Sequence, residues 1–246
     1  MADPDRRPAF YAPAREDHGW KDWWTLLHPP YTAWHLSYVV IGACLAPHVD
    51  ALRLTASVLA FFFAVGIAAH ALDELHGHPL RTRISDRALI AATAVGLLVA
   101  VALGIAGVFR VGPVLIPFIV IGPFLVLAYN LELFGGRMHT GLAFAVSWGA
   151  FPLLTGYVAQ AAGLESPAIV AAVAAVGFSL AQRSLSTPAR ALRRRVARVD
   201  GAVVFEDGAV RRLDQSVLLA PLEHALRALS WSMVALALAL VGARFI

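Results

Sequence analysis

The chain has 246 residues, of which 59% are hydrophobic and 15% are charged, and its mean hydropathy is +0.69. A soluble domain needs a largely polar surface, so this composition excludes an ordinary soluble protein and predicts an integral membrane protein. The net charge of +4 and the isoelectric point near 9.7 do not require a nucleic-acid partner, because the cations gather on one side of the predicted membrane.

Runs of roughly 18 or more apolar residues predict membrane-spanning helices. About seven such runs occur, at 31–49, 53–75, 87–108, 111–130, 140–162, 166–185 and 226–244. We therefore expect an all-α integral membrane protein with about seven transmembrane helices in a single domain, residues 1–246. Its expected parts are an N-terminal interfacial segment (1–30), a six-helix core (31–185), a basic cytoplasmic loop with a small hairpin (186–213) and a final long helix (214–246).

The distribution of Lys and Arg predicts the orientation. With the N-terminus in the cytoplasm, seventeen of the 20 Lys and Arg residues, Arg6, Arg7 and Arg15 among them, lie on the cytoplasmic side. The positive-inside rule therefore favours N-terminus in and C-terminus out, with the cations contacting anionic lipid headgroups. The arginine-rich, lysine-poor composition indicates a GC-rich genome and hence a bacterial cytoplasmic membrane.

The N-terminal stretch has no apolar h-region, so we do not expect a cleaved signal peptide. Residues 18–28, "HGWKDWWTLLH", combine three tryptophans with charged residues, which is typical of a segment lying in the membrane interface. Pro29 and Pro30 then break the chain and direct it into the bilayer. His35 lies deeper in the first predicted span, where we expect a core histidine with a satisfied hydrogen bond.

The second predicted helix ends in an unusual cluster of ionisable groups, "AAHALDELHGHPLRTR". Gly77 suits the end of a helix, and Pro79 cannot continue it. At 100° per residue, His70, Asp73 and Glu74 are expected on one face of this helix, one to two turns from water.

Two carboxylates on one helix face predict that the face points into the bundle, because lipid does not tolerate them. One imidazole and two carboxylates are a ligand set for one divalent ion, magnesium or another, so His70, Asp73 and Glu74 are candidate metal ligands. They are also candidate catalytic residues, since a histidine suits acid–base work near neutral pH.

Other polar residues fall at the same predicted membrane side and are candidate substrate-binding groups: Asn130, Glu132, Arg183, Arg190, Glu223, His224 and Arg227. Glu223 and Arg227 are alternatively spaced to pair with each other along a helix. The arginines between 190 and 198 indicate a face for lipid headgroups. The stretch "DGAVVFEDGAVRRL" predicts a hairpin that turns at Asp207-Gly208 and rests on the cytoplasmic opening.

Three stretches resemble the UbiA superfamily of intramembrane prenyltransferases over about residues 20–190. "LLHPPYTAWHLSYVVIGACLA" is similar to the family's opening, with an interfacial segment, a proline break and a first span. "AVGIAAHALDELHGHPLRTRIS" resembles the end of its second helix, where an NDxxDxxxD motif precedes a basic loop. "LAYNLELFGGRMHTGLAFAVSWGAFPLLTGYVAQ" resembles its hairpin between the fourth and fifth helices.

The resemblance implies that an isoprenoid diphosphate ionises and that an acceptor captures the allylic cation. In the family, two aspartate-rich motifs bind magnesium ions that hold the diphosphate. Here the first motif falls on Ala69, His70, Asp73 and Gly77, so one of its aspartates is kept. The second falls near "FSLAQRSLSTPARALRRR", which contains no acid and offers Gln182, Arg183 and Arg190 in its place.

Arginines repel magnesium but bind an anionic headgroup directly. We therefore expect a divergent UbiA-like enzyme that acts on an isoprenoid or similarly long apolar lipid, with at most one metal ion and without the usual pair of magnesium ions. A metal-dependent membrane lipid hydrolase is an alternative, for which His28, His139 and His224 are further possible ligands. A non-enzymatic protein that binds a lipid, quinone or carotenoid, or assists assembly, is another.

Overall fold

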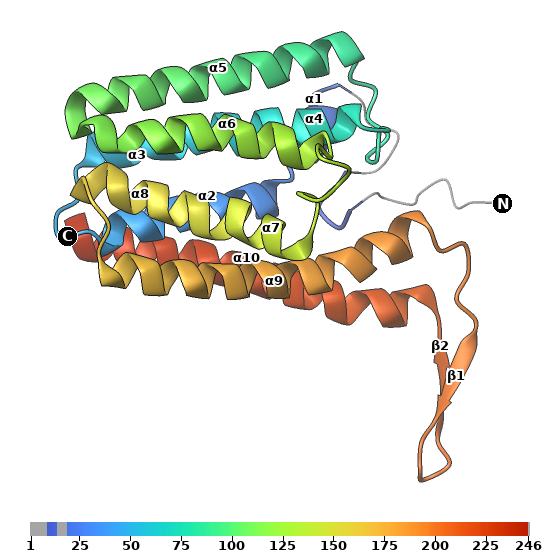
Figure 1. Ribbon diagram of the computed structural model, residues 1–246. Helices are drawn as coiled ribbons and strands as arrows, with labels where there is room; N and C mark the ends of the chain where they lie inside the picture. The colour runs from blue at the N-terminus through green and yellow to red at the C-terminus, as the bar shows by residue number, and fades with distance from the viewer. Residues whose placement is uncertain (1–8, 14–18, 246) are drawn as a thin grey trace.

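The computed structural model describes residues 9–13 and 19–245. Arg6, Arg7 and Arg15 and much of the expected interfacial segment 1–30 lie outside the described residues. The long helices run side by side as a bundle, and a small two-stranded hairpin projects from one end of it (Figure 1).

The described residues are mostly helical. The α-helices are α1 (Trp20–Leu26), α2 (Pro29–Leu45), α3 (Ala51–Phe61), α4 (His70–Leu75), α5 (Asp86–Val111), α6 (Ile116–Asn130), α7 (Gly141–Ala145), α8 (Phe151–Ala161), α9 (Ser166–Arg194) and α10 (Gln215–Phe245). Between them lie two π-helical segments, η1 (Phe62–Ala69) and η3 (Val146–Ala150), a 3₁₀ turn, η2 (Pro113–Leu115), and the strands β1 (Gly201–Val204) and β2 (Val210–Leu213).

The prediction of an all-α membrane protein is confirmed. Among the described residues, six helical stretches are long and apolar enough to cross a membrane: 51–75, 86–111, 113–130, 141–161, 166–194 and 215–245. The remaining predicted span corresponds to α2, whose 17 residues are near the lower limit for crossing a bilayer.

Side-chain hydrogen bonds mark the start of three helices. Asp50 accepts from the backbone amide of Arg53 before α3, Ser85 caps α5, and Thr140 caps α7 in the same way. These are the residue types that satisfy the free amides of a first helical turn. The predicted stop of the second span is also confirmed, since α4 ends at Leu75 and Gly77 follows with a φ of 88°.

The centre of the bundle depends on the close packing of α2 against α8. A Cβ atom added to Gly42 would lie 1.9 Å from the backbone oxygen of Leu153, and one added to Gly156 would lie 2.2 Å from that of Val39. The two helix backbones therefore touch at glycines, as is common between membrane helices. Trp34 and Tyr38 fill the neighbouring core between α2, α8, α9 and α10.

The outer faces of α5 and α9 are apolar and exposed. Phe109 is 86% exposed, Leu98 69% and Val170 69%, with many similar side chains around them. Apolar residues exposed over whole helix faces are what a lipid-facing surface requires.

Two predictions about the region 186–213 are wrong. Helix α9 does not end near residue 185 but continues to Arg194, so Arg190, Arg193 and Arg194 lie on a helix and not in a loop. The hairpin forms, with Val204 opposite Val210 and Gly208 in the turn at a φ of 83°. It does not rest on the opening, however: almost all its residues are exposed, and it extends away from the bundle (Figure 1).

Candidate functional site

A polar cavity of about 190 Å³ lies at the end of the bundle from which the hairpin projects. That volume is enough for roughly six water molecules. Its walls come from segments far apart in the sequence: residues 9–11, the start of α2, the junction of η1 and α4, the end of α6, the segment from 139 to 148, the second half of α9 and the first part of α10.

Helix α9 contributes most of the charge. Arg183, Arg190 and Arg194 follow one another at helical spacings of seven and four, and Arg193 borders the same face, so all four line the cavity. This arrangement depends on the continuation of α9 beyond the apolar run. A loop of the same composition would not align these side chains.

Two of the four arginines are held by named partners. Arg183 donates from Nη1 to the hydroxyl of Tyr129 at 2.5 Å, and its guanidinium lies 5.2 Å from the centre of the Phe144 ring. Arg193 forms an ion pair with Glu223 of α10. Glu223 therefore does not pair with Arg227 along its own helix, which was the alternative that its spacing allowed.

The cavity carries an excess of positive charge. Its only carboxylates among the described residues are Asp73 and Glu223, and Glu223 is neutralised by Arg193. The other three arginines carry three positive charges. An ionised Asp73 offsets one of them, so two positive charges remain. An anion is the ligand that such a cavity stabilises best.

Two buried polar atoms in this cavity have no hydrogen-bond partner among the described residues: Nε of Arg194, a donor, and Oε1 of Gln182, an acceptor. Because unpaired buried polar groups destabilise a fold, such atoms in a cavity wall indicate a ligand that supplies the partners. The ligand would have to offer an acceptor to Arg194 and a donor to Gln182.

Four histidines line the cavity, and all four are oriented by the same kind of hydrogen bond. Nδ1 of each contacts a backbone oxygen: His28 that of Leu26 at 2.7 Å, His35 that of Trp148 at 2.7 Å, His70 that of Gly66 at 3.2 Å and His139 that of Tyr129 at 3.3 Å. A carbonyl oxygen only accepts, so Nδ1 carries the proton. In the neutral ring, Nε2 is then left with a lone pair and can take up a proton.

The two π-helical segments position two of these histidines. His35 donates to the oxygen of Trp148, within η3, and His70 donates to the oxygen of Gly66, within η1. π-Helical turns occur frequently at functional sites, because they displace side chains from regular helical positions. Here His70 follows η1 directly and begins α4.

The rings of His28 and His70 stack, with their centres 4.5 Å apart, and Tyr11 lies 5.5 Å from His28. Burial lowers the pKa of His28 well below its usual value, and the neighbouring His70 acts in the same direction. Burial likewise raises the pKa of the Tyr11 hydroxyl well above 10. Both side chains are therefore neutral near pH 7.

The expectation that His70, Asp73 and Glu74 share one face is wrong for Glu74. His70 and Asp73 line the cavity, but Glu74 is fully buried on another side of α4. Its carboxylate accepts from the backbone amides of Leu80 and Thr82 and from the hydroxyl of Thr82, each at 2.9 Å. Glu74 thus holds the loop after α4.

This placement answers whether the expected metal ion fits. Both oxygens of Glu74 are occupied by hydrogen bonds, which leaves His70 and Asp73 as an incomplete ligand set. Across residues 9–13 and 19–245, no three His, Cys, Asp or Glu side chains lie close enough to hold a metal ion. The residues present therefore do not fit the expected ion.

The other predicted residues divide between the cavity and the surface. Asn130 lines the cavity, where its amide donates to the oxygen of Val126 at 2.8 Å. Glu132 is exposed in the turn after α6, and His224 is exposed on α10. Arg227 does not line the cavity either: its guanidinium lies over the ring of Phe10, at 4.9 Å.

The sequence alone did not predict most of the cavity wall. Among the residues not selected from the sequence as site residues are Tyr11, His28, Tyr31, His35, Tyr129, His139, Trp148, Arg193 and Arg194. His28 and His139 were considered only as extra metal ligands. A usable signal was present, because most of these residues lie within a few positions of a predicted helix end on the cytoplasmic side.

Neither a protein-family model, nor a curated protein, nor a solved structure matches this chain. The functional interpretation therefore depends on the geometry of the cavity.

Proposed function

We propose that this chain is a UbiA-like integral membrane enzyme that binds an isoprenoid or similarly long lipid through an anionic phosphate head, held by arginines in the polar cavity. The observation that carries the proposal is the set of Arg183, Arg190 and Arg194, which leaves two positive charges in excess and a buried guanidinium nitrogen with no partner among residues 9–13 and 19–245. A phosphate monoester carries between one and two negative charges at pH 7 and matches that excess.

The proposed topology has seven spans, with α2 as the short first one, and places the cavity and the N-terminus on the cytoplasmic side. The cations support it: the arginines of α9 and of the following segment lie at the cavity end. Arg53, Arg110 and Arg244 belong instead to the start of α3 and to the ends of α5 and α10, at the opposite end of the bundle (Figure 1). The positive-inside rule assigns the arginine-rich end to the cytoplasm.

The proposed chemistry is transfer of the lipid group to a nucleophilic acceptor. The bond between the allylic carbon and the phosphate oxygen breaks, and its electron pair leaves with the phosphate, which the arginines stabilise. The rings of Tyr129, Phe144 and Trp148 face the allylic cation. The acceptor oxygen or carbon bonds to that cation, and its proton moves to Nε2 of His70, whose lone pair is free.

Binding of a prenyl monophosphate to the purified full chain in lipid nanodiscs tests the proposal. Arg194→Gln is expected to weaken binding by about tenfold or more, since a charge-assisted hydrogen bond contributes roughly 1.5–3 kcal/mol. Arg195→Gln is the matched control, because Arg195 is the next residue and is exposed outside the cavity. Equal binding by Arg194→Gln and the unchanged protein would refute the proposed head site.

A hydrolase that acts on a phosphorylated lipid is the second candidate. The observation that favours it is the presence around one cavity of four histidines whose Nδ1 atoms donate to backbone oxygens, which directs the lone pair of a neutral ring to Nε2. In that reaction water takes the place of the acceptor, and the products are a free lipid alcohol and phosphate. Product analysis with and without an acceptor separates the two reactions, and binding without any turnover favours a non-enzymatic lipid-binding protein.

A further inference from the structure

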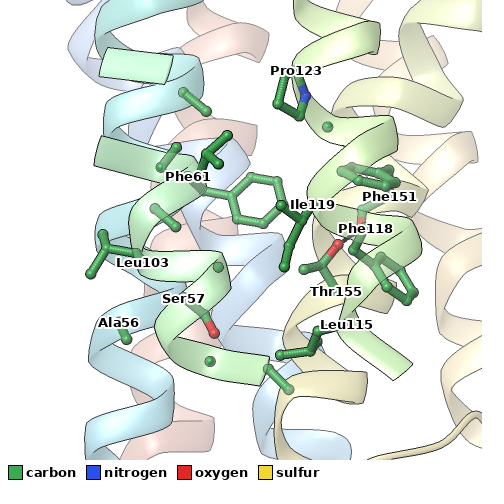
Figure 2. Close-up of a pocket in the computed structure, with 18 of the residues that line it drawn as sticks. Ala56, Ser57, Phe61, Leu103, Leu115, Phe118, Ile119, Pro123, Phe151 and Thr155 are labelled. Carbon is green, nitrogen blue, oxygen red and sulfur yellow. Dashed lines mark hydrogen bonds between the residues drawn. The ribbon is translucent and has the colours of Figure 1, made fainter. Parts of the chain in front are cut away.

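A second cavity, of about 370 Å³, lies between α3, α5, α6 and α8 (Figure 2). Its walls are almost wholly apolar. Phe61 of α3, Phe118 of α6 and Phe151 of α8 line it, with the ring centre of Phe151 6.1 Å from that of Phe61 and 5.7 Å from that of Phe118. Small residues line much of the rest, among them Ala60, Ala64, Ala100, Gly104 and Gly122. A volume in this range is typical of a ligand pocket.

The two cavities follow one another along the bundle axis. The chain from α3 to α4 lines the apolar cavity between Leu52 and Val65 and the polar cavity between Val65 and Asp73. At 1.5 Å per residue, the apolar part extends over roughly 20 Å of helix. The apolar cavity therefore reaches from the middle of the bundle towards the membrane face opposite the arginines.

Val65 and Trp148 line both cavities. They lie on the two π-helical segments, η1 and η3, which are the same segments that bind His35 and His70 through backbone oxygens. The junction between the cavities is thus formed by irregular helix, and it lies beside the candidate catalytic histidine.

We propose that the apolar cavity is the chamber for the tail of the lipid whose phosphate head lies in the polar cavity, and that the tail crosses from one cavity to the other alongside Val65 and Trp148, the buried residues that line both. This inference rests on the proposed function. The two cavities match the two ends of one amphipathic molecule: arginines at the head and aliphatic and aromatic walls along the tail.

The far end of the chamber limits the length of that tail. Arg53 lies there and donates to the backbone oxygens of Gln160 at 3.3 Å and Arg110 at 3.0 Å, which ties the end of α5 to the end of α8. A tail that runs from the junction to this end meets charged and hydrogen-bonded groups. The chamber therefore selects for tail length, and short tails leave its far part empty.

Filling the chamber tests the inference. Ala100 lines it, whereas Ala102, two residues further along α5, is exposed on the outside of the bundle. Binding of dimethylallyl, geranyl and geranylgeranyl phosphates is measured for Ala100→Phe and, as the matched control, Ala102→Phe. Ala100→Phe is expected to weaken geranylgeranyl phosphate by about tenfold and to leave the shortest probe unchanged, because only the long tail meets the new ring. Ala102→Phe is expected to bind all three like the unchanged protein.

Equal binding of geranylgeranyl phosphate by Ala100→Phe and the unchanged protein would overturn the tail chamber while leaving the head site standing. Equal loss of all three probes in a folded Ala100→Phe protein would also overturn it, since a tail site discriminates by length. The head site fails by a different result, in which Arg194→Gln leaves the shortest probe unaffected. Ala60→Phe, which places the ring on α3, repeats the test where Ala100→Phe does not fold.

Discussion

Glu74 and Asp73 are adjacent acids with different expected roles: Glu74 holds a loop, and Asp73 lines the polar cavity. Replacing Glu74 tests its role separately from that of Asp73. The Glu74 carboxylate is fully buried and accepts three hydrogen bonds of 2.9 Å, two from backbone amides of the loop after α4 and one from the hydroxyl of Thr82. Nδ1 of His78 lies a further 3.7 Å from it. We expect Glu74→Gln to destabilise the fold without direct effect on ligand binding.

The magnitude follows from these contacts. In Glu74→Gln, the amide oxygen keeps the two bonds from Thr82, but the NH₂ group then faces the amide of Leu80, so one buried donor loses its acceptor. A buried unsatisfied group costs about 1–3 kcal/mol, and the remaining bonds lose their charge assistance. We therefore expect a loss of roughly 2–4 kcal/mol in the free energy of unfolding.

Unfolding by SDS titration in mixed micelles, with prenyl phosphate binding measured on the folded fraction, checks this prediction. Asp73→Asn is the matched comparison, because it removes the neighbouring carboxylate from the cavity wall and leaves the loop intact. A Glu74→Gln protein as stable as the unchanged chain would refute the reasoning. So would a folded Glu74→Gln fraction that no longer binds the prenyl phosphate.

Three further outcomes follow from particular contacts. Gly42→Ala is expected to lower the free energy of unfolding by about 3 kcal/mol or more, because its methyl group would lie 1.9 Å from a backbone oxygen of α8. Gly177→Ala, with open space at its Cβ, is expected to be neutral or slightly stabilising, and thermal unfolding compares the two variants. Tyr129→Phe removes the hydroxyl that accepts a hydrogen bond from Arg183, so Arg183 is no longer held in position. Binding of prenyl phosphate, measured by equilibrium titration, is expected to weaken several-fold, which corresponds to about 1 kcal/mol of binding free energy. Circular dichroism is expected to show no change in fold. Burial lowers the pKa of His28, so below the usual value of 6.5 the unfolded chain binds more protons than the folded chain. The contribution of His28 to stability is therefore expected to be constant above that pH and to fall below it. His28→Gln is expected to flatten that part of a stability–pH curve, and an unchanged curve would contradict the lowered pKa of His28.

Hydrophobicity was sufficient to locate the long helices, because each span of a bilayer requires a continuous apolar run. It failed at the end of α9, where the sequence becomes polar while the helix continues. The arginines from 190 to 194 interrupt the apolar run but not the helix, since arginine is a good helix former and these side chains turn towards a cavity. The prediction of a loop there confused the boundary of the apolar run with the boundary of the helix.

Helical periodicity located His70 and Asp73 at the site but could not assign Glu74. The angle between positions 73 and 74 is about 100°, so two adjacent acids at the edge of one face can point to different surroundings. What decides their roles is the loop of residues 76–85, which returns against α4 and presents its amides to Glu74. That return is set by the left-handed residues Gly77, His78 and Arg81, whose effect on the path of a loop cannot be read from spacing.

The cavity is rich in arginines, whereas the aspartate motifs of the family that the sequence resembles are rich in acids. This difference in charge explains why Glu74 is not needed in the cavity. An acid-rich site holds a phosphate through metal ions that bridge carboxylates and phosphate oxygens, and it requires acids on both facing helices. Here the helix facing Asp73 supplies arginines, so the phosphate of the proposed ligand would meet guanidinium groups directly. A site that binds phosphate through arginines does not require Glu74 as a second acid beside Asp73. Glu74 instead accepts hydrogen bonds from the loop after α4. Asp73 is then the carboxylate that remains in the cavity wall without an arginine ion pair among the described residues, and it shares that wall with His70.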